Sequence, residues 1–291
     1  MTDGGRTQVA SVPLEQYVLA TVLAEFAPPN GDLTRVDRMI EVQSIISRTY
    51  VLAHRGRHAA AGFDVCASTH CQLYRSVPAA AAPWMGVGAE AVRQTAGTVL
   101  WFDTGPARVV YHADCGGHTS GAAEVWGGAA PSYLSALADD GAAASVHARW
   151  EFRVERDALR RALNADRRTA VGGWFDTVHV FERDNAGRAV LVLLQGERQP
   201  LVRGGELRDV LVRTFGARSI RSTLFEITRD GDAFVFQGRG FGHGVGLCQA
   251  GAFARIKAGA SPEEVLSRYF PGTKLIRLED SHDQRVARGG R

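Results

Sequence analysis

One acidic residue near the start of the chain, Glu25, has a type and position suited to acid–base chemistry. Its spacing from Leu14 and Val18 puts all three on one face of a predicted helix, so its carboxyl should meet the protein interior or a cleft wall. Burial there and the negative end of the helix dipole would both raise the pKa of this carboxyl. A carboxyl that stays protonated near neutral pH can act as a general acid. The alternative is that Glu25 lies at the edge of this face and reaches solvent.

Two polar residues of the next predicted helix, Gln43 and Arg48, could assist such an acid. Gln43 falls within an otherwise apolar stripe, and a buried amide must be hydrogen-bonded, so it would contact a ligand or cap a loop carbonyl. The rigid guanidinium fork of Arg48 would orient a carboxylate or a sugar oxygen, or else form an ion pair at the surface.

Thiol and imidazole side chains gather in the segment that follows. Cys66 and Cys71 lie close together in sequence with His70 between them, and His58 precedes them. Two thiolates and an imidazole form most of a zinc site, with His58 or His70 as the third ligand. A local disulfide in an exported protein explains the cysteines equally well, and two inert thiols are a third interpretation.

A second cluster of titratable residues, at 111–119, follows a predicted strand. Cys115 paired with His112 or His118 would suit a cysteine hydrolase, but the sequence offers no recognisable oxyanion-stabilising partner. The glycines after Cys115 favour a binding loop instead, because they let a ligand approach the backbone.

A glycine-rich run at 238–252 precedes another predicted helix. It lacks the Gly-Lys-Ser/Thr ending of a phosphate-binding loop, so nucleotide binding is not favoured. His243 has glycine on both sides and therefore little local packing, which suits a group presented to a ligand.

The elements that must position these residues mix helices with hairpins. Helices are predicted over 13–25, 34–55, 88–96, 157–164 and 205–215 and twice after 246, and hairpins over 98–103 with 108–114, 176–183 with 189–195, and 223–228 with 233–237. Helices and hairpins segregate rather than alternate, which predicts an α+β fold. We expect a single domain over 12–279, with helices packed on antiparallel hairpins around an active-site cleft, and a disordered basic tail over 280–291.

Composition excludes several classes of protein. The 291 residues carry a formal net charge of +3, too small and too evenly spread for a nucleic-acid binder. No apolar run approaches the length of a membrane span, and residues 1–11 do not have a signal-peptide pattern. A chain of this length folds without staples, so any metal or disulfide is optional to the fold.

The motifs taken together resemble the stage II sporulation protein D family, also called the SpoIID/LytB domain. In chain order they are LEQYV at 14–18 with Glu25, QSIISRTY at 43–50, STHCQLY at 68–74, CGGHT at 115–119, Trp126, and GFGHGVGLCQAGA at 240–252. Each is weak alone, but their order over 13–278 is specific. The chain departs from the family pattern at Phe26, where Met is usual, and at Cys248, where Ser is usual, and neither change removes a catalytic group.

The resemblance implies a lytic transglycosylase that cleaves the MurNAc–GlcNAc bond of peptide-stripped peptidoglycan and leaves 1,6-anhydro-MurNAc ends. Glu25 would then be the catalytic acid and afterwards the base. The glycan would be held by Gln43, Arg48, Tyr111, His112, Gly117 and His243. No cofactor is required, and zinc, if bound, would fall on Cys66, Cys71 and His58.

The resemblance also bears on partners and location. The expected partners are glycan strands and a cell-wall amidase, with no nucleic acid and no membrane span. The expected location is outside the cytoplasm, in the periplasm or cell wall. The alternative function is a non-catalytic module that binds wall glycan or enhances an amidase, because some members of the family are described as amidase enhancers.

Overall fold

The computed structural model describes residues 8–28, 31–75, 79–142, 145, 147–279 and 285–290. Contacts divide the chain into two compact units. The terminal unit comprises Met1–Val110 and Ala252–Arg291, and the inserted unit comprises Tyr111–Gly251. The sequence predicted one domain over 12–279, and no linker composition marks either boundary. The second boundary falls inside a helix, α7 (Gln249–Lys257), so the backbone continues there without a break in regular structure.

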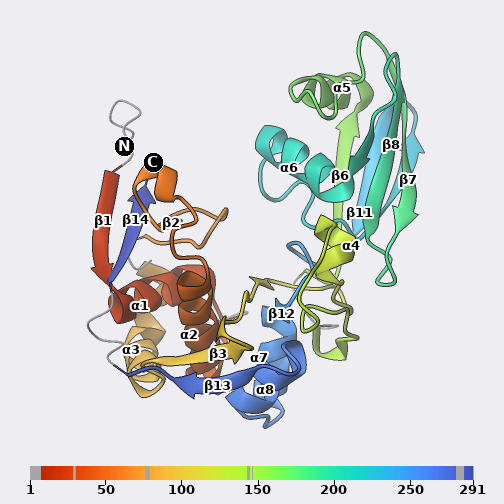
Figure 1. Ribbon diagram of the computed structural model, residues 1–291. Helices are drawn as coiled ribbons and strands as arrows, with labels where there is room; N and C mark the ends of the chain where they lie inside the picture. The colour runs from red at the N-terminus through yellow and green to blue at the C-terminus, as the bar shows by residue number, and fades with distance from the viewer. Residues whose placement is uncertain are drawn as a thin grey trace. The chain divides into compact units, whose positions relative to one another are not determined.

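The terminal unit contains several helices, of which α2 makes the most contacts with the others. They are α1 (Leu14–Glu25), α2 (Val36–Ala53), α3 (Met85–Gln94), α7 and α8 (Pro262–Tyr269) (Figure 1). Helix α2 packs against α1, α3 and α8. Every residue from Met39 to Val51 is buried. A helix buried on all sides carries no single apolar face, so the stripe seen in the sequence is only part of its packing surface.

Sequence signals at helix ends predict α1 and α8 better than α2. Pro13 directly precedes α1, as expected. Ser261 caps α8, and its hydroxyl accepts a hydrogen bond from a first-turn N–H at 3.2 Å. The helix predicted over 34–55 starts two residues later than expected, because α2 begins at Val36 after Arg35, whose φ of 54° is left-handed.

The first sheet of the terminal unit joins the two ends of the chain. Its strand order is β1 (Gln8–Pro13), β14 (Arg285–Gly290) and β2 (Val65–Cys66). Strand β14 pairs antiparallel with β1 and parallel with β2. Val286 is fully buried opposite Val12 in the register. The expected disordered tail is therefore a strand over these residues, because pairing and apolar burial order it, and the rest of 280–291 lies outside the described residues.

The second sheet of the terminal unit corrects one predicted hairpin. Its order is β13 (Lys274–Arg277), β3 (Thr98–Phe102) and β4 (Gly105–Pro106). The hairpin predicted for 98–103 with 108–114 is thus only partly formed. Tyr111–His112 instead forms β5, which pairs parallel with β12 (Leu247–Cys248) in the inserted unit.

The inserted unit contains two three-stranded antiparallel sheets and several helices. The sheets are ordered β10 (Phe225–Asp230), β11 (Ala233–Gly238), β6 (Trp150–Glu155) and β7 (Phe175–Arg183), β8 (Ala189–Gly196), β9 (Leu201–Arg203), and the helices are α4 (Ala122–Trp126), α5 (Arg156–Asn164) and α6 (Gly204–Phe215). Both sheets, α5 and α6 contribute to one apolar core. The two hairpins predicted here, 176–183 with 189–195 and 223–228 with 233–237, are confirmed within a residue or two.

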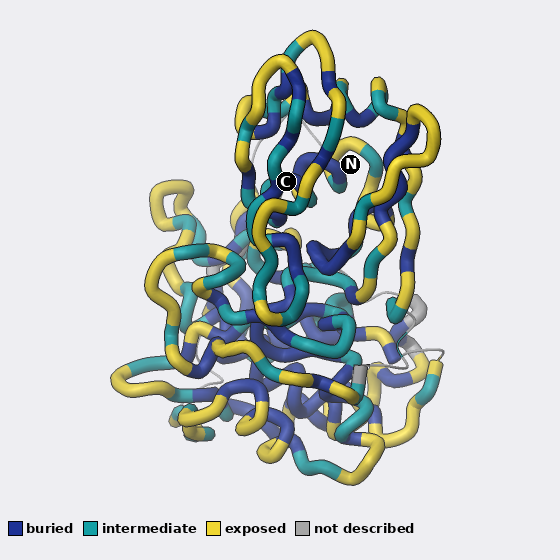
Figure 2. Tube along the Cα trace, turned by 90° about the vertical axis from the view of Figure 1, so that its right-hand side faces the viewer, coloured by how far each residue is buried: buried dark blue, intermediate teal, exposed yellow. Residues whose placement is uncertain are grey.

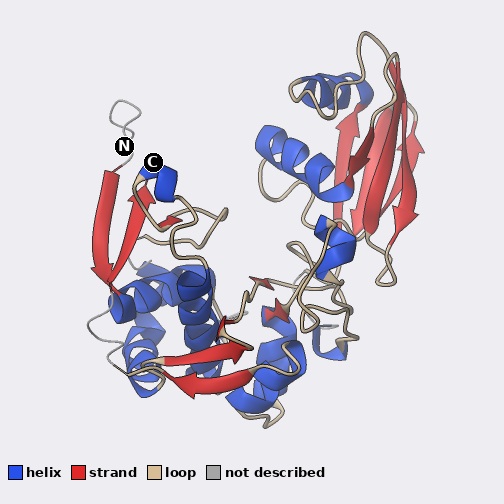
Figure 3. Cartoon of the chain, in the orientation of Figure 1, coloured by secondary structure: helices blue, strands red, loops and turns tan. Residues whose placement is uncertain are grey.

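The predicted α+β class is confirmed, since helices and mainly antiparallel strands occur in both units (Figure 3). Figure 2 shows buried residues running through the interior of the trace, while exposed residues gather at the loops. Among the described residues, no helix is both long and apolar enough to span a lipid bilayer.

Candidate functional site

Glu25 is the last residue of α1, and its surroundings lie between the two predicted alternatives. Leu14, Val18 and Val22 of the same helix are buried, whereas Glu25 is partly exposed. Its Oε1 accepts a hydrogen bond from the backbone N–H of Leu73 at 2.5 Å. The carboxyl is therefore held in a defined direction on a residue that remains partly exposed.

A second residue of α1, Tyr17, holds the same segment. Its hydroxyl donates to Gln72 Oε1 at 3.2 Å, and its ring stacks on Tyr74 with centroids 5.3 Å apart. Burial raises the pKa of Tyr17 above its ordinary value, and the charge of Glu25 adds to this effect. Residues 72–74 therefore each contact α1. Tyr17 contacts the first and the third, and Glu25 binds the N–H of the second.

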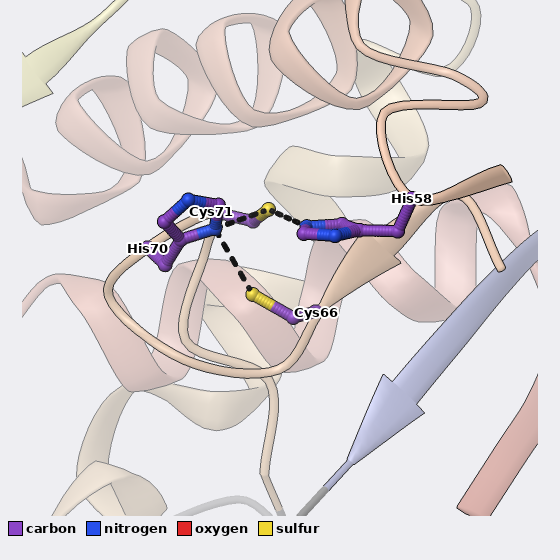
Figure 4. Close-up of side chains that lie close together, drawn as sticks. All are labelled: His58, Cys66, His70 and Cys71. Carbon is purple, nitrogen blue, oxygen red and sulfur yellow. Dashed lines mark hydrogen bonds between the residues drawn. The ribbon is translucent and has the colours of Figure 1, made fainter. Parts of the chain in front are cut away.

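The predicted metal site contains one candidate ligand more than the three that the sequence analysis proposed. His58, Cys66, His70 and Cys71 place their donor atoms within 4.8 Å of one another (Figure 4). His58 Nε2 lies 3.3 Å from Cys71 Sγ, and His70 Nδ1 lies 3.6 Å from both sulfur atoms. Donors around a tetrahedral zinc ion are about 3.3–3.8 Å apart, so this set fits the metal. The structure brings both histidines to the site, where the sequence left a choice between them.

The two thiols of this cluster are not equivalent. Both are free cysteines in the structure, with no disulfide between them. Burial opposes ionisation of Cys66, but hydrogen bonds from Ser68 outweigh it and the pKa of Cys66 is lowered. Burial raises the pKa of Cys71. Because the thiolate is the form that binds metals, Cys66 is the better prepared ligand.

Arg48 does not have the surroundings of a substrate-binding residue. Its side chain is 0% exposed, and its Nε and Nη2 donate to the two carboxylate oxygens of Glu15 at 2.9 and 2.6 Å. Nη1 donates to the backbone carbonyls of Thr98, at 3.0 Å, and Ser44, at 3.4 Å. Arg48 therefore joins α1, α2 and β3 inside the terminal unit, which corrects its predicted role in holding the glycan.

Gln43 is likewise an interior residue. Its side chain is fully buried on α2, and its amide Nε2 donates to Ser47 Oγ at 3.3 Å. The structure bears out the prediction that a buried amide here is hydrogen-bonded. The partner is a side chain of the same helix, so the contact does not indicate a ligand.

His243 fixes the glycine-rich loop to β5 rather than offering its nitrogen atoms to a ligand. Nε2 donates to the carbonyl of Tyr111 at 2.9 Å, and Nδ1 accepts from the N–H of Val245 at 3.1 Å. Burial lowers the pKa of His243 to about 4, so the ring is neutral at pH 7. Both ring nitrogens are thus occupied by the backbone. Trp126, which is 48% exposed, lies beside the imidazole, with 5.3 Å between the two ring centroids.

Other predicted residues of the inserted unit divide by burial. His112 is 4% exposed, so it cannot contact a glycan, which corrects its predicted role. Cys115 is fully buried and is not an open nucleophile, the alternative that the sequence did not favour. Tyr111 and Gly117 are partly exposed. The φ of Gly117 is +105°, and a Cβ built there would meet nothing within 4 Å, so this backbone can approach a ligand.

Sequence reasoning missed Glu15 and the N–H of Leu73. Glu15 is separated from Arg48 by 33 residues, and Leu73 from Glu25 by 48, so neither contact has a signal in local periodicity. Trp126 was noted only as part of the family motif, although an exposed tryptophan beside a partly exposed imidazole is a usual surface for sugar rings.

Comparison with known proteins gives two family matches, and each falls within one unit. Residues 2–102 match the family model described as Stage II sporulation protein. Residues 142–246 match a model described as a domain of unknown function. The first range lies within the N-terminal part of the terminal unit and the second within the inserted unit, in agreement with the division by contacts.

Curated relatives extend the similarity over most of the chain. Stage II sporulation protein D of Bacillus subtilis is 24% identical over 281 residues, covering 92% of this chain and 75% of that protein. The corresponding protein of Bacillus amyloliquefaciens is 23% identical with the same coverage. The Amidase enhancer of B. subtilis is 25% identical, covering 81% of this chain and 37% of that protein. The chain is thus similar to the stage II sporulation protein D family, through the family model over residues 2–102 and through relatives of 23–24% identity.

Proposed function

We propose that the protein is a peptidoglycan lytic transglycosylase with Glu25 as its acid and base. The observation that carries the proposal is the partly exposed carboxyl of Glu25, oriented by the N–H of Leu73 at the end of α1. Similarity to the stage II sporulation protein D family and to a protein named Amidase enhancer supports a role at the cell wall. We place this role outside the cytoplasmic membrane, where peptidoglycan lies.

The proposed reaction needs one carboxyl rather than two. Hydrolytic glycosidases use a second carboxyl to activate water or to attack the sugar. In a lytic transglycosylase the C6 hydroxyl of the substrate is the nucleophile. Protonated Glu25 donates to the glycosidic oxygen as the MurNAc–GlcNAc bond breaks. The resulting carboxylate then takes the proton of the C6 hydroxyl, which closes the 1,6-anhydro ring and returns Glu25 to its starting state.

Zinc on His58, Cys66, His70 and Cys71 is part of the proposal. The close spacing of the four donors and the lowered pKa of Cys66 support it. A bound ion would supply a rigid crosslink within residues 58–71. Leu73 follows Cys71 by two residues, so a fixed position of Cys71 would also restrict Leu73. The Leu73 N–H then stays bonded to Glu25 and keeps the carboxyl oriented. We assign no chemical step to the metal.

Replacement of Glu25 by Gln tests the catalytic role. The amide retains an oxygen for the Leu73 N–H but cannot donate or accept the reaction's proton, so the fold should persist. Product release from peptide-stripped glycan, followed by mass spectrometry of anhydro-MurNAc ends, should fall by at least about 100-fold. Glu90→Gln is the matched control, since Glu90 is exposed on α3 and bonded only to its helix neighbours in the described contacts, Arg93 and Gln94. Product yield from Glu25→Gln equal to that of the control would contradict the proposal.

Removal of the metal tests the positioning role separately. Cys66→Ser should lower the zinc content by one equivalent per chain and slow product formation, while Glu25 itself is intact. A competing disulfide predicts instead that Cys66 and Cys71 resist thiol reagents in the denatured, unreduced protein. Unchanged zinc content in Cys66→Ser would remove this cluster from the proposal without affecting the assignment of Glu25.

The similarity to an Amidase enhancer favours a second candidate, a module that binds wall glycan or an amidase without cutting. The same digestion distinguishes the two. Wild-type protein that sediments with peptide-stripped glycan but yields no anhydro ends would support the second candidate.

A further inference from the structure

The inserted unit contains a second group of metal-binding residue types, and it is completely enclosed. His112, Cys115 and Cys248 place their donor atoms within 4.8 Å of one another, and all three residues are buried. Parallel pairing of β5 with β12 puts His112 opposite Cys248. The N–H of Cys115 donates to Cys248 Sγ at 3.2 Å, which fixes the third member against the second. The terminal unit's cluster shares no residue with this one.

The orientation of His112 leaves one buried nitrogen of this group without a partner. Nδ1 donates to the carbonyl of Val245 at 3.0 Å, so the lone pair of the neutral ring is on Nε2. Among the residues that the structure describes, Nε2 has no hydrogen-bond partner. Water cannot easily replace one, because His112 is only 4% exposed. Leaving a buried acceptor unpaired is unfavourable. An imidazole that donates one N–H to a backbone carbonyl and keeps its other nitrogen unpaired has the usual arrangement of a metal ligand.

A carboxylate and a balancing charge contact one member of this group, Cys115. Asp139 is fully buried, and its Oδ2 lies 3.6 Å from Cys115 Sγ. The buried guanidinium of Arg188 donates to the carbonyl of Cys115 at 2.5 Å. Two thiolates and one carboxylate would balance a divalent cation together with the charge of Arg188. Nitrogen, sulfur and carboxylate donors in a closed, dry site are typical of structural zinc.

We propose that His112, Cys115 and Cys248, with Asp139 beside Cys115, form a second, structural zinc site inside the inserted unit. The ion would join β5, β12 and the loop that holds Cys115. The site does not depend on the proposed catalytic function, because every one of its ligands is closed to a glycan.

Metal content provides the test. Wild-type protein, purified under reducing conditions and loaded with zinc, should hold a second equivalent per chain beyond the one expected in the terminal unit. Cys66→Ser/Cys71→Ser removes the first cluster and should retain one equivalent, and the Co²⁺ form of this variant should show thiolate-to-cobalt charge transfer. Adding Cys248→Ser should abolish both the remaining metal and the charge-transfer band. Ser222→Ala, a buried hydroxyl of the same unit outside the cluster, is the matched control and should keep the metal.

Two results would overturn the proposal. The first is wild-type protein whose entire metal content is lost in Cys66→Ser/Cys71→Ser while far-ultraviolet circular dichroism shows that this variant is folded. The second is a disulfide between Cys115 and Cys248, detected as two thiols that react in the denatured protein only after reduction. The thiol count and metal content of the wild type decide the matter even if Cys248→Ser does not fold.

Discussion

Replacing Arg48 by Met would separate a structural role for this residue from the substrate-binding role that its motif suggests. Arg48 is 0% exposed and forms a paired contact with Glu15, which is itself 15% exposed. The substitution keeps apolar bulk on α2 but leaves the carboxylate of Glu15 without its guanidinium. The carbonyls of Ser44 and Thr98 lose a donor as well.

The expected cost follows from the class of interaction. Removing one partner of a buried ion pair destabilises a protein by about 3–5 kcal/mol, because the remaining charge stays partly desolvated. For a folding unit of this size that corresponds to a fall in Tm of about 6–20 °C. Arg48→Lys should fall between the wild type and Arg48→Met, because Lys keeps the charge but cannot bond both oxygens of Glu15 in the fixed geometry of the fork.

Thermal and urea unfolding followed by circular dichroism would measure the effect. Arg93→Met is the control: the side chain of Arg93 is 70% exposed and pairs with Glu90, itself 48% exposed, so its loss should cost under about 1 kcal/mol. A double-mutant cycle with Glu15→Gln should give a coupling energy of at least about 1 kcal/mol, because the two residues touch. If Arg48→Met unfolds like the control and only glycan binding weakens, the structural role is refuted.

Three further predictions concern single contacts. Tyr17→Phe removes the hydroxyl bonded to Gln72 and should lower the free energy of unfolding by about 1 kcal/mol in urea titration, whereas no change would mean that this bond does not hold residues 72–74. Ser261→Ala deletes the cap of α8 and should also cost about 1 kcal/mol, against a few tenths for Ser261→Gly. Burial lowers the pKa of His54, so near and below the ordinary pKa of 6.5 the unfolded chain binds more protons than the folded protein, and stability should fall as pH drops through that value. His54→Gln should therefore reduce the fall in Tm between about pH 7.5 and about pH 5. An identical slope in both proteins would contradict the assignment.

The sequence by itself determined the elements whose signals are local. The hairpin joining β7 to β8 turns at Gly187 and the one joining β10 to β11 at Gly231, both with positive φ, and both were predicted. Pro13 and Ser261 marked helix starts for the same reason, since a cap acts on the residues next to it. The motifs also pointed to Glu25 and to the thiols of residues 66–71 before any contact was known.

Tertiary structure decided what each of those residues does. Leu73 reaches Glu25 across 48 residues of sequence, Arg48 finds Glu15 across 33, and His112 bonds Val245 across 133. No local period encodes such partners, because they depend on which elements pack together and not on the spacing within either one. Burial is likewise a property of the packed unit. An arginine or histidine on the surface can bind a ligand, whereas Arg48 and His243 are bonded within the protein and stabilise the fold.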